Sequence, residues 1–146
     1  MSLSLRRATI EDADEIAALF SASFRLLTFL PPLHTLEEDR AYVRDVLLTR
    51  QRVTVAEEDG RILGFMAETE GWINQLYVRQ GLLRQGVGSA LIGDAKSRNE
   101  SLTLWCFLEN HPARSFYERH GFVEVERTDG SGNEAKRPDI RYRWSR

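Results

Sequence analysis

The sequence has few of the residues from which disulfide-linked, metal-binding and membrane-spanning proteins are built. One cysteine, Cys106, stands among 146 residues, so neither an internal disulfide nor a cysteine metal cluster can form. Of the three histidines, His111 and His120 flank one expected helix without a third ligand in view, so no metal site is expected. No apolar run approaches the ~18 residues of a membrane span, and the start MSLSLRRATIEDAD lacks the apolar core of a secretory signal. We therefore expect a cytoplasmic protein without a membrane partner.

An excess of charge of either sign is also missing. Lysine and arginine number 20 against 22 acidic residues, a net charge of −2, so nothing draws the whole chain toward nucleic acid. The tail KRPDIRYRWSR contains four arginines interleaved with Tyr142 and Trp144, a pattern that can bind single strands of nucleic acid. Because this patch is small, we expect no nucleic-acid partner. We interpret the tail instead as a charged edge strand that lines an acceptor site or a dimer contact.

The length predicts one domain over residues 1–146, large enough for one core. Hydrophobic alternation and periodicity predict an α/β chain in the order β-α-α-β-β-β-α-β-α-β-β. Thr35 and Glu38 form a capping-box sequence at the start of the second helix, and Asp59-Gly60 is a hairpin signal. The strands are expected at 4–7, 53–57, 62–69, 72–78, 102–108, 122–127 and 140–144. We expect strand 102–108 to be buried on both faces and strand 140–144 to lie at an edge.

The chain is organised around LYVRQGLLRQGVGSAL, residues 76–91. A strand, a glycine-bearing turn and a helix start follow one another, and such an arrangement can cradle a phosphate with unpaired backbone N–H groups. The segment lacks the Gly-Lys-Ser/Thr ending of a P-loop, and Leu91 occupies the third glycine position of a dinucleotide fingerprint. A tight turn without a ligand remains an alternative on these residues alone.

A second motif follows, NHPARSFYERHGF, residues 110–122. Together the two stretches resemble the GNAT family, the acyl-CoA-dependent N-acyltransferases. The family pattern N-x-x-A-x-x-x-Y-x-x-x-G-F is met at every spaced position, whereas the first motif, Q/R-x-x-G-x-G/A, departs at Leu83. The resemblance covers about residues 3–125 and implies the GNAT fold, a mixed central sheet of about seven strands flanked by about four helices.

The resemblance also implies acetyl-CoA as the co-substrate and a primary amine as the acceptor. Tyr117 is implied as the general acid, since a phenol of pKa near 10 is protonated at neutral pH and can protonate the leaving thiolate. The backbone N–H of Leu76 is implied as the group that polarises the thioester carbonyl. The implied cofactor-binding residues are Leu76, Tyr77, Val78, Leu83, Arg84, Gln85, Gly86, Val87, Gly88, Ser89, Asn110, Ala113, Phe116 and Tyr117.

A general base is harder to find in the sequence. Some family members carry a glutamate where this chain has Trp72, so that role cannot be transferred. Asn74 and Gln75 could hold a water, while Glu68 and Glu70 are alternatives that also suit solvated strand ends. We therefore expect a water chain, or an acceptor amine that is weakly basic.

The acceptor itself is not specified by the motifs. The segment from residue 26 to residue 36 contains Phe29, Leu30 and Leu33, which favours a partly hydrophobic acceptor, and His34 in the same loop could contact it. Cys106 is expected to be buried and inert.

Three functional hypotheses follow. The first is an N-acetyltransferase that acts by direct attack of the amine in a ternary complex. A homodimer is the assembly considered for it. The second is a protein of the same fold that binds acyl-CoA without turnover, as a sensor or partner. The third, a nucleotide-binding protein, predicts binding of NAD or ATP without CoA.

Overall fold

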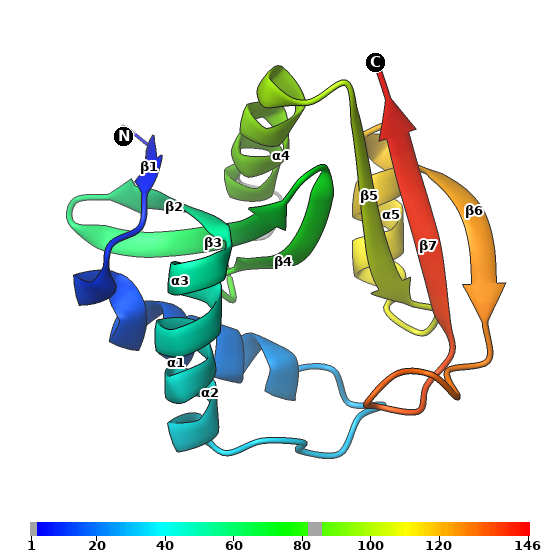
Figure 1. Cartoon of the computed structure of the whole chain (residues 1–146), viewed down its shortest axis with the longest axis horizontal. Helices are drawn as coiled ribbons and strands as arrows, with labels where there is room; N and C mark the ends of the chain where they lie inside the picture. The colour runs from blue at the N-terminus through cyan, green and yellow to red at the C-terminus, as the bar shows by residue number, and fades with distance from the viewer. Residues whose placement is uncertain (1–2, 82–85) are drawn as a thin grey trace.

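A computed structural model describes residues 3–81 and 86–146, and one mixed sheet runs through them (Figure 1). Its spatial order is β1-β2-β3-β4-β5-β7-β6, and only the β4–β5 pair is parallel. The strands are β1 (Ser4–Arg7), β2 (Arg52–Glu58), β3 (Arg61–Thr69), β4 (Trp72–Val78), β5 (Ser101–Phe107), β6 (Val123–Thr128) and β7 (Asp139–Ser145). The predicted α/β fold and the chain order of its elements are confirmed.

Helices cover both faces of the sheet. A short 3₁₀ turn (Ile10–Asp12) leads into α1 (Ala13–Arg25). The second helix consists of α2 (Leu36–Tyr42), a π-helical turn (Val43–Leu47) and α3 (Leu48–Arg50); α4 (Val87–Arg98) and α5 (His111–Arg119) follow. The helices α1 and α2 pack with the π turn on the β2–β3 face through Ile16, Leu47 and Phe65, and α4 and α5 pack on the other face through Leu91, Tyr117 and Leu104.

Local sequence signals explain several element ends. Thr35 accepts the backbone N–H of Glu38 at 3.1 Å, and the Glu38 carboxylate accepts the N–H of Thr35 at 2.8 Å. This reciprocal capping box is the one that the sequence predicts, and a cap of this kind is worth about 1 kcal/mol. In the β2–β3 turn, Asp59 and Gly60 have φ of 53° and 76°, as a tight hairpin requires.

Two sequence predictions about strands are wrong. β7 is an inner strand that pairs with both β5 and β6, so β6 forms the edge. Ile140 and Tyr142 of β7 are fully buried, whereas every residue of β6 is exposed, so chain order was a poor guide to spatial order. β5 is not buried on both faces along its whole length either, because Trp105 is 44% exposed.

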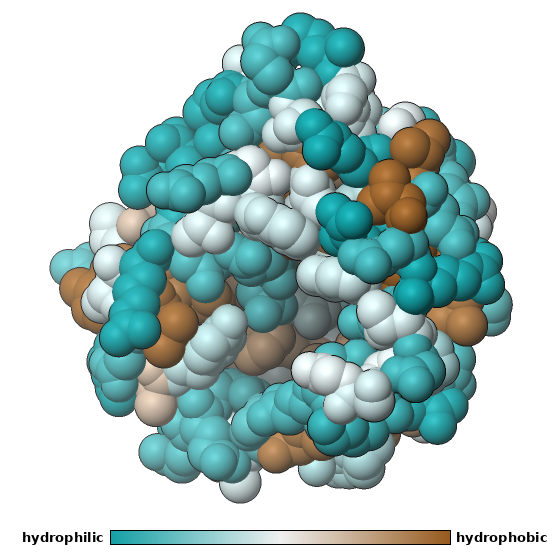
Figure 2. Space-filling view, turned by 45° about the vertical axis from the view of Figure 1, so that its right-hand side comes forward, coloured by the Kyte–Doolittle hydropathy of each residue, from teal (hydrophilic) through white to brown (hydrophobic). Residues whose placement is uncertain are grey.

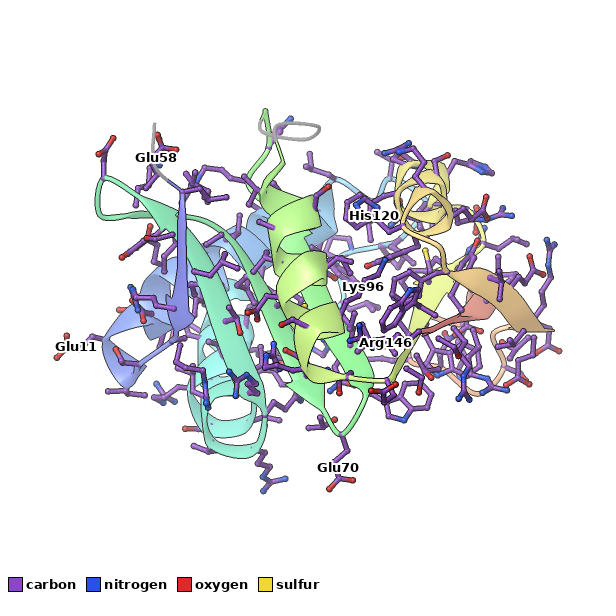
Figure 3. All side chains as sticks on the ribbon, turned by 90° about the horizontal axis from the view of Figure 1, so that it is seen from above. Glu11, Glu58, Glu70, Lys96, His120 and Arg146 are labelled. Atoms are coloured by element: carbon purple, nitrogen blue, oxygen red, sulfur yellow. The ribbon has the colours of Figure 1, made fainter. Side chains whose placement is uncertain are left out.

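The joint between β4 and β5 is short. The two strands pair only at Trp72 with Thr103 and Ile73 with Leu104, and then diverge (Figure 1). Across this joint, α4 links the two sides: the Lys96 ammonium donates to the His120 carbonyl at 2.5 Å (Figure 3). The sheet therefore contains a four-stranded and a three-stranded antiparallel half with an opening between them.

Candidate active site

The opening between β4 and β5 exposes backbone groups that would be paired in a continuous sheet. Arg79 donates its N–H to the Leu63 carbonyl in β3 at 2.7 Å. Because neighbouring residues of a strand direct their N–H and C=O groups to opposite sides, those of Val78 and Leu76 face away from β3. The Leu76 N–H is therefore directed toward the opening.

A cleft of about 1110 Å³ continues from this opening between the two halves of the sheet. Figure 2 shows that this side of the molecule is hollowed, with hydrophobic side chains at the floor of the hollow. The lining comes from α1, α2, the middle of β4, the end of β5, the start of α5 and the β6–β7 loop. A cleft of this size can hold the reactive ends of two substrates together.

Tyr117 lies in the wall of this cleft, on the inner face of α5. Tyr117 is 9% exposed, and its ring packs edge-on against the rings of Phe116 and Phe122 at centroid distances of 5.3 and 5.7 Å. Burial raises the pKa of Tyr117 well above its usual value, with smaller contributions from Cys106 and Tyr77. The phenol therefore remains protonated at every physiological pH, and it can donate a hydrogen bond or a proton to a group in the cleft.

The other residues of the second motif position α5. The Asn110 side chain accepts the backbone N–H of Ala113 at 3.4 Å, so Asn110 caps the helix. Asn110 and Ala113 also line the cleft, as the sequence prediction of a cofactor contact requires. Phe116 faces α4 instead of the cleft, and its ring lies under the start of that helix.

The start of α4 has the form of an anion-binding turn. Gly86 adopts a φ of +87°, and a Cβ placed on it would meet none of the described residues within 4 Å. A helix of 12 residues begins directly after it. A Cβ on Gly88 would lie 3.0 Å from the Phe116 ring, so this glycine is required by packing against α5. The Ser89 hydroxyl lies 2.9 Å from Nε2 of His120. The predicted residues Leu83, Arg84 and Gln85 lie outside the described residues.

The candidate bases from the sequence are occupied or distant. Glu68 is buried and pairs with Arg98 of α4 at 2.7 Å, on the face opposite α1 and α2. Glu70 stands in the β3–β4 turn and points away from the body of the protein (Figure 3). The Asn74 amide donates to Gln51 and Thr69, and neither Glu68 nor Glu70 lines the cleft.

One contact across the cleft could not be read from the sequence. His34 Nε2, in the α1–α2 loop, lies 2.9 Å from the Glu134 carboxylate in the β6–β7 loop. Phe29 and Phe107 meet nearby with ring centroids 5.7 Å apart. These two contacts join the N-terminal and C-terminal parts of the chain at the open end of the cleft. No periodicity or motif in the sequence links these positions.

Cys106 lines the cleft floor as a buried thiol. Burial raises its pKa to about 12, so almost none of it is thiolate at neutral pH. A covalent acyl-enzyme needs the thiolate as its nucleophile. The structure thus favours direct transfer over a Cys106 intermediate.

Within residues 3–81 and 86–146, no group of three or more histidine, cysteine or acidic side chains is placed to hold a metal ion. None of the helices in these segments has the length and apolar character of a bilayer span.

Comparison with known proteins identifies relatives of this arrangement. Residues 49–124 match the model of the acetyltransferase (GNAT) domain. An 85-residue segment is 37% identical to the peptidyl-lysine N-acetyltransferase YiaC of Escherichia coli and covers 58% of each protein, so the chain matches little more than half of that relative. An uncharacterised N-acetyltransferase of Archaeoglobus fulgidus is 31% identical over its full length and 90% of this chain.

Solved structures agree with the sequence matches. The apo form of YjaB from Escherichia coli superposes with a TM-score of 0.82 at 25% identity, over 99% of this chain and 98% of YjaB. The PaiA N-acetyltransferase of Thermoplasma acidophilum, solved with coenzyme A, gives 0.75 at 19% identity over the whole of both chains, which shows a shared fold. With its domain match, its full-length relative and its divided seven-stranded sheet, the chain belongs to the GNAT family of N-acetyltransferases.

Proposed function

We propose that this protein transfers the acetyl group of acetyl-CoA to a primary amine, by direct attack within a ternary complex. The observation that carries the proposal is the opening between β4 and β5, which places the outward-facing backbone of Leu76 and the buried phenol of Tyr117 on one cleft. The family match and the coenzyme A bound by PaiA, a protein of the same fold, support the choice of co-substrate.

In this proposal the strand segment Leu76, Tyr77 and Val78 runs along the pantetheine arm, with the backbone groups of Leu76 and Val78 facing it. Residues 83–89 hold the diphosphate. Asn110 and Ala113 of the second motif flank the donor in the cleft, and Phe116 meets it beside Gly86, Gly88 and Ser89 at the start of α4. The Leu76 N–H donates to the thioester oxygen, where negative charge develops during attack. Tyr117 donates to the departing sulfur. Its raised pKa makes it a weaker acid than free tyrosine, so proton transfer accompanies thiolate departure instead of preceding it.

A second candidate is a protein that binds acyl-CoA without turnover. Trp72 in β4 and the engagement of Glu68 by Arg98 favour it, because neither supplies a base at the opening. Tyr117 in the cleft wall favours turnover instead, because its phenol has no hydrogen-bond partner among the described residues.

The deciding experiment is calorimetric titration with acetyl-CoA, CoA, NAD and ATP, followed by a thiol-release assay over a panel of amines. We expect acetyl-CoA and CoA to bind, NAD and ATP to bind much more weakly, and thiol release to depend on amine. Binding of acetyl-CoA without release for any amine would support the second candidate. Binding of NAD or ATP without CoA would overturn both and favour a nucleotide-binding protein.

Four further proposals concern the setting of the protein. We propose a single domain over residues 1–146 and a cytoplasmic location, the latter supported by the lone, unpaired Cys106. A homodimer is supported by β6, an edge strand on which Val123 is 61% exposed. The absence of a nucleic-acid partner is supported by the tail, where Arg141 and Arg137 pair with Glu126 and Glu109. Cell fractionation tests the location, light scattering tests the homodimer, and a single-strand binding assay tests the absence of a nucleic-acid partner.

A further inference from the structure

The acceptor side of the cleft contains one carboxylate whose role the fold does not explain. Four carboxylates line the cleft, those of Glu38, Asp39, Glu134 and Asp139. Glu38 belongs to the capping box, Glu134 meets His34 at 2.9 Å, and Asp139 accepts from the Asn133 amide at 3.2 Å. Among the described residues, no hydrogen bond or ion pair reaches the carboxylate of Asp39.

Asp39 is also the most buried of the four, with 7% of its surface exposed. The Asp39 carboxylate oxygens are not among the fully enclosed side-chain atoms of the described residues that lack a hydrogen-bond partner, so they open onto the cleft while the rest of the residue is buried. Since Asp39 lines the cleft, the partner that fits is one that arrives through the cleft.

Four aromatic rings line the same cleft as this carboxylate. Phe20 of α1 lies 5.3 Å from Tyr77 and 5.9 Å from Tyr42, centroid to centroid, and Phe24 lies 6.3 Å from Phe20. All four rings line the cleft, and Tyr42 lies three residues after Asp39 on α2, about one helical turn away. A carboxylate beside aromatic faces suits an alkyl chain that ends in a positive charge, which gains both ion pairing and cation–π attraction.

The charge that Asp39 binds is best assigned to a group other than the reacting nitrogen. A carboxylate stabilises the ammonium form of an amine, and an ammonium nitrogen has no lone pair with which to attack a thioester. The connection to β4 runs through Tyr42, which follows Asp39 by three residues on α2 and accepts a hydrogen bond of 3.3 Å from Gln75, the residue before Leu76.

We propose that Asp39 is a specificity-determining residue that binds a second cationic group of the acceptor. The preferred acceptor is then a primary amine on an aliphatic stem that lies along Phe20 and Phe24 and carries a further positive charge beyond the reacting nitrogen. This inference rests on the proposed acetyl transfer. It also refines the sequence expectation of a partly hydrophobic acceptor, since the stem is apolar and its far end is charged.

The test compares acceptors that differ by one charge. 1,5-Diaminopentane and 1-aminopentane have the same stem, and the capped dipeptides Lys-Lys and Lys-Gln repeat the comparison in a peptide. We expect the wild-type protein to have a KM at least about tenfold lower for the doubly charged member, the size typical of one desolvated charged contact. A preference in the free amines alone, or in the peptides alone, identifies which source of the second charge the cleft accepts.

The variants separate recognition from folding. Asp39→Asn is expected to raise KM for the doubly charged acceptor about tenfold, with kcat within about twofold and no change for 1-aminopentane. Asp39→Glu is expected to restore part of the preference. Glu37→Gln, an exposed position on the same helix that pairs with Arg40, removes one charge as a control and is expected to change neither constant.

The outcomes distinguish this proposal from the proposed function. Equal losses for both amines, a fall in kcat, or no wild-type preference in either pair would overturn the role of Asp39 while acetyl transfer stands. If no amine releases thiol, calorimetric binding of 1,5-diaminopentane to the CoA complex decides the matter. Binding that Asp39→Asn weakens about tenfold supports the Asp39 site, and binding that is absent or unchanged overturns it.

Discussion

His34 and Glu134 meet at 2.9 Å although 100 positions separate them in the sequence. Their hydrogen bond raises the pKa of His34 above its ordinary 6.5, with smaller contributions from Glu38 and Asp39. Because the folded-state pKa exceeds the unfolded one, the contact stabilises the folded protein fully below about pH 6.5. That contribution is lost as the pH rises through the raised value. The two loops at the open end of the cleft are therefore held together more firmly in mild acid.

We expect NMR titration to show the His34 pKa above 6.5 in the wild type and closer to 6.5 in Glu134→Gln. Glu126→Gln, which removes a β6 charge that pairs with Arg141, provides the control and is expected to leave His34 unchanged. An unchanged His34 in Glu134→Gln would mean that the two loops do not meet in solution.

Replacing Tyr117 by phenylalanine removes the proposed proton donor while keeping the ring that packs on Phe116 and Phe122. We expect acetyl-CoA affinity to be retained and kcat to fall about 10²-fold or more, the usual contribution of a general acid. Calorimetry and thiol release measure the two effects.

Tyr142→Phe is the matched control. Its hydroxyl donates to Glu118 at 2.7 Å outside the cleft, so its loss is expected to cost about 1 kcal/mol of stability and no turnover. An unchanged kcat in Tyr117→Phe would remove Tyr117 as the acid.

The glycine turn can be tested at Gly88. The Cβ of an alanine or valine at this position would lie about 3.0 Å from the Phe116 ring. This close contact predicts lower stability as well as lost acetyl-CoA binding. We expect Gly88→Ala to cost about 1–3 kcal/mol, and a second change, Phe116→Leu, to recover part of it. Acetyl-CoA binding is expected to remain weak in the double variant, because a bound diphosphate needs the bare backbone. Full recovery of affinity would show that this glycine serves packing alone.

Glu68 offers a test of the missing base. Its carboxylate is 5% exposed and holds Arg98, which is 27% exposed and also pairs with Asp94. We expect Glu68→Gln to lower the free energy of unfolding by about 2 kcal/mol in denaturant melts, because it weakens a largely buried pair. Turnover per folded molecule is expected to stay the same.

Glu70→Gln in the adjacent turn is expected to change neither stability nor turnover. A large fall in kcat for Glu68→Gln without loss of stability would instead make Glu68 the base.

Local signals in the sequence predicted much of this fold. The capping box at Thr35 and the Asp59-Gly60 turn each depend on residues within a few positions of one another, and both are present in the structure. The inner position of β7 and the open face at Trp105 depend on pairing between distant strands, which alternation within one strand does not encode.

The site divides in the same way. Tyr117 and Leu76 were predicted from motifs, which are continuous stretches of sequence, and both residues line the cleft. Asp39 and the His34–Glu134 contact were missed, because the acceptor half is assembled from α2 and two loops that meet only in the folded chain.

The two residue pairs that join β4 to β5 also bear on how long the protein survives in a cell. The two half-sheets have separate hydrogen-bond ladders, so partial opening along this joint breaks few bonds. A pantetheine arm bound there would act as a removable strand, and at a concentration one hundred times its Kd it would add about 2.7 kcal/mol to stability. Resistance to proteases would then rise and fall with the supply of acetyl-CoA, so that the abundance of the protein would report the metabolic state of the cell.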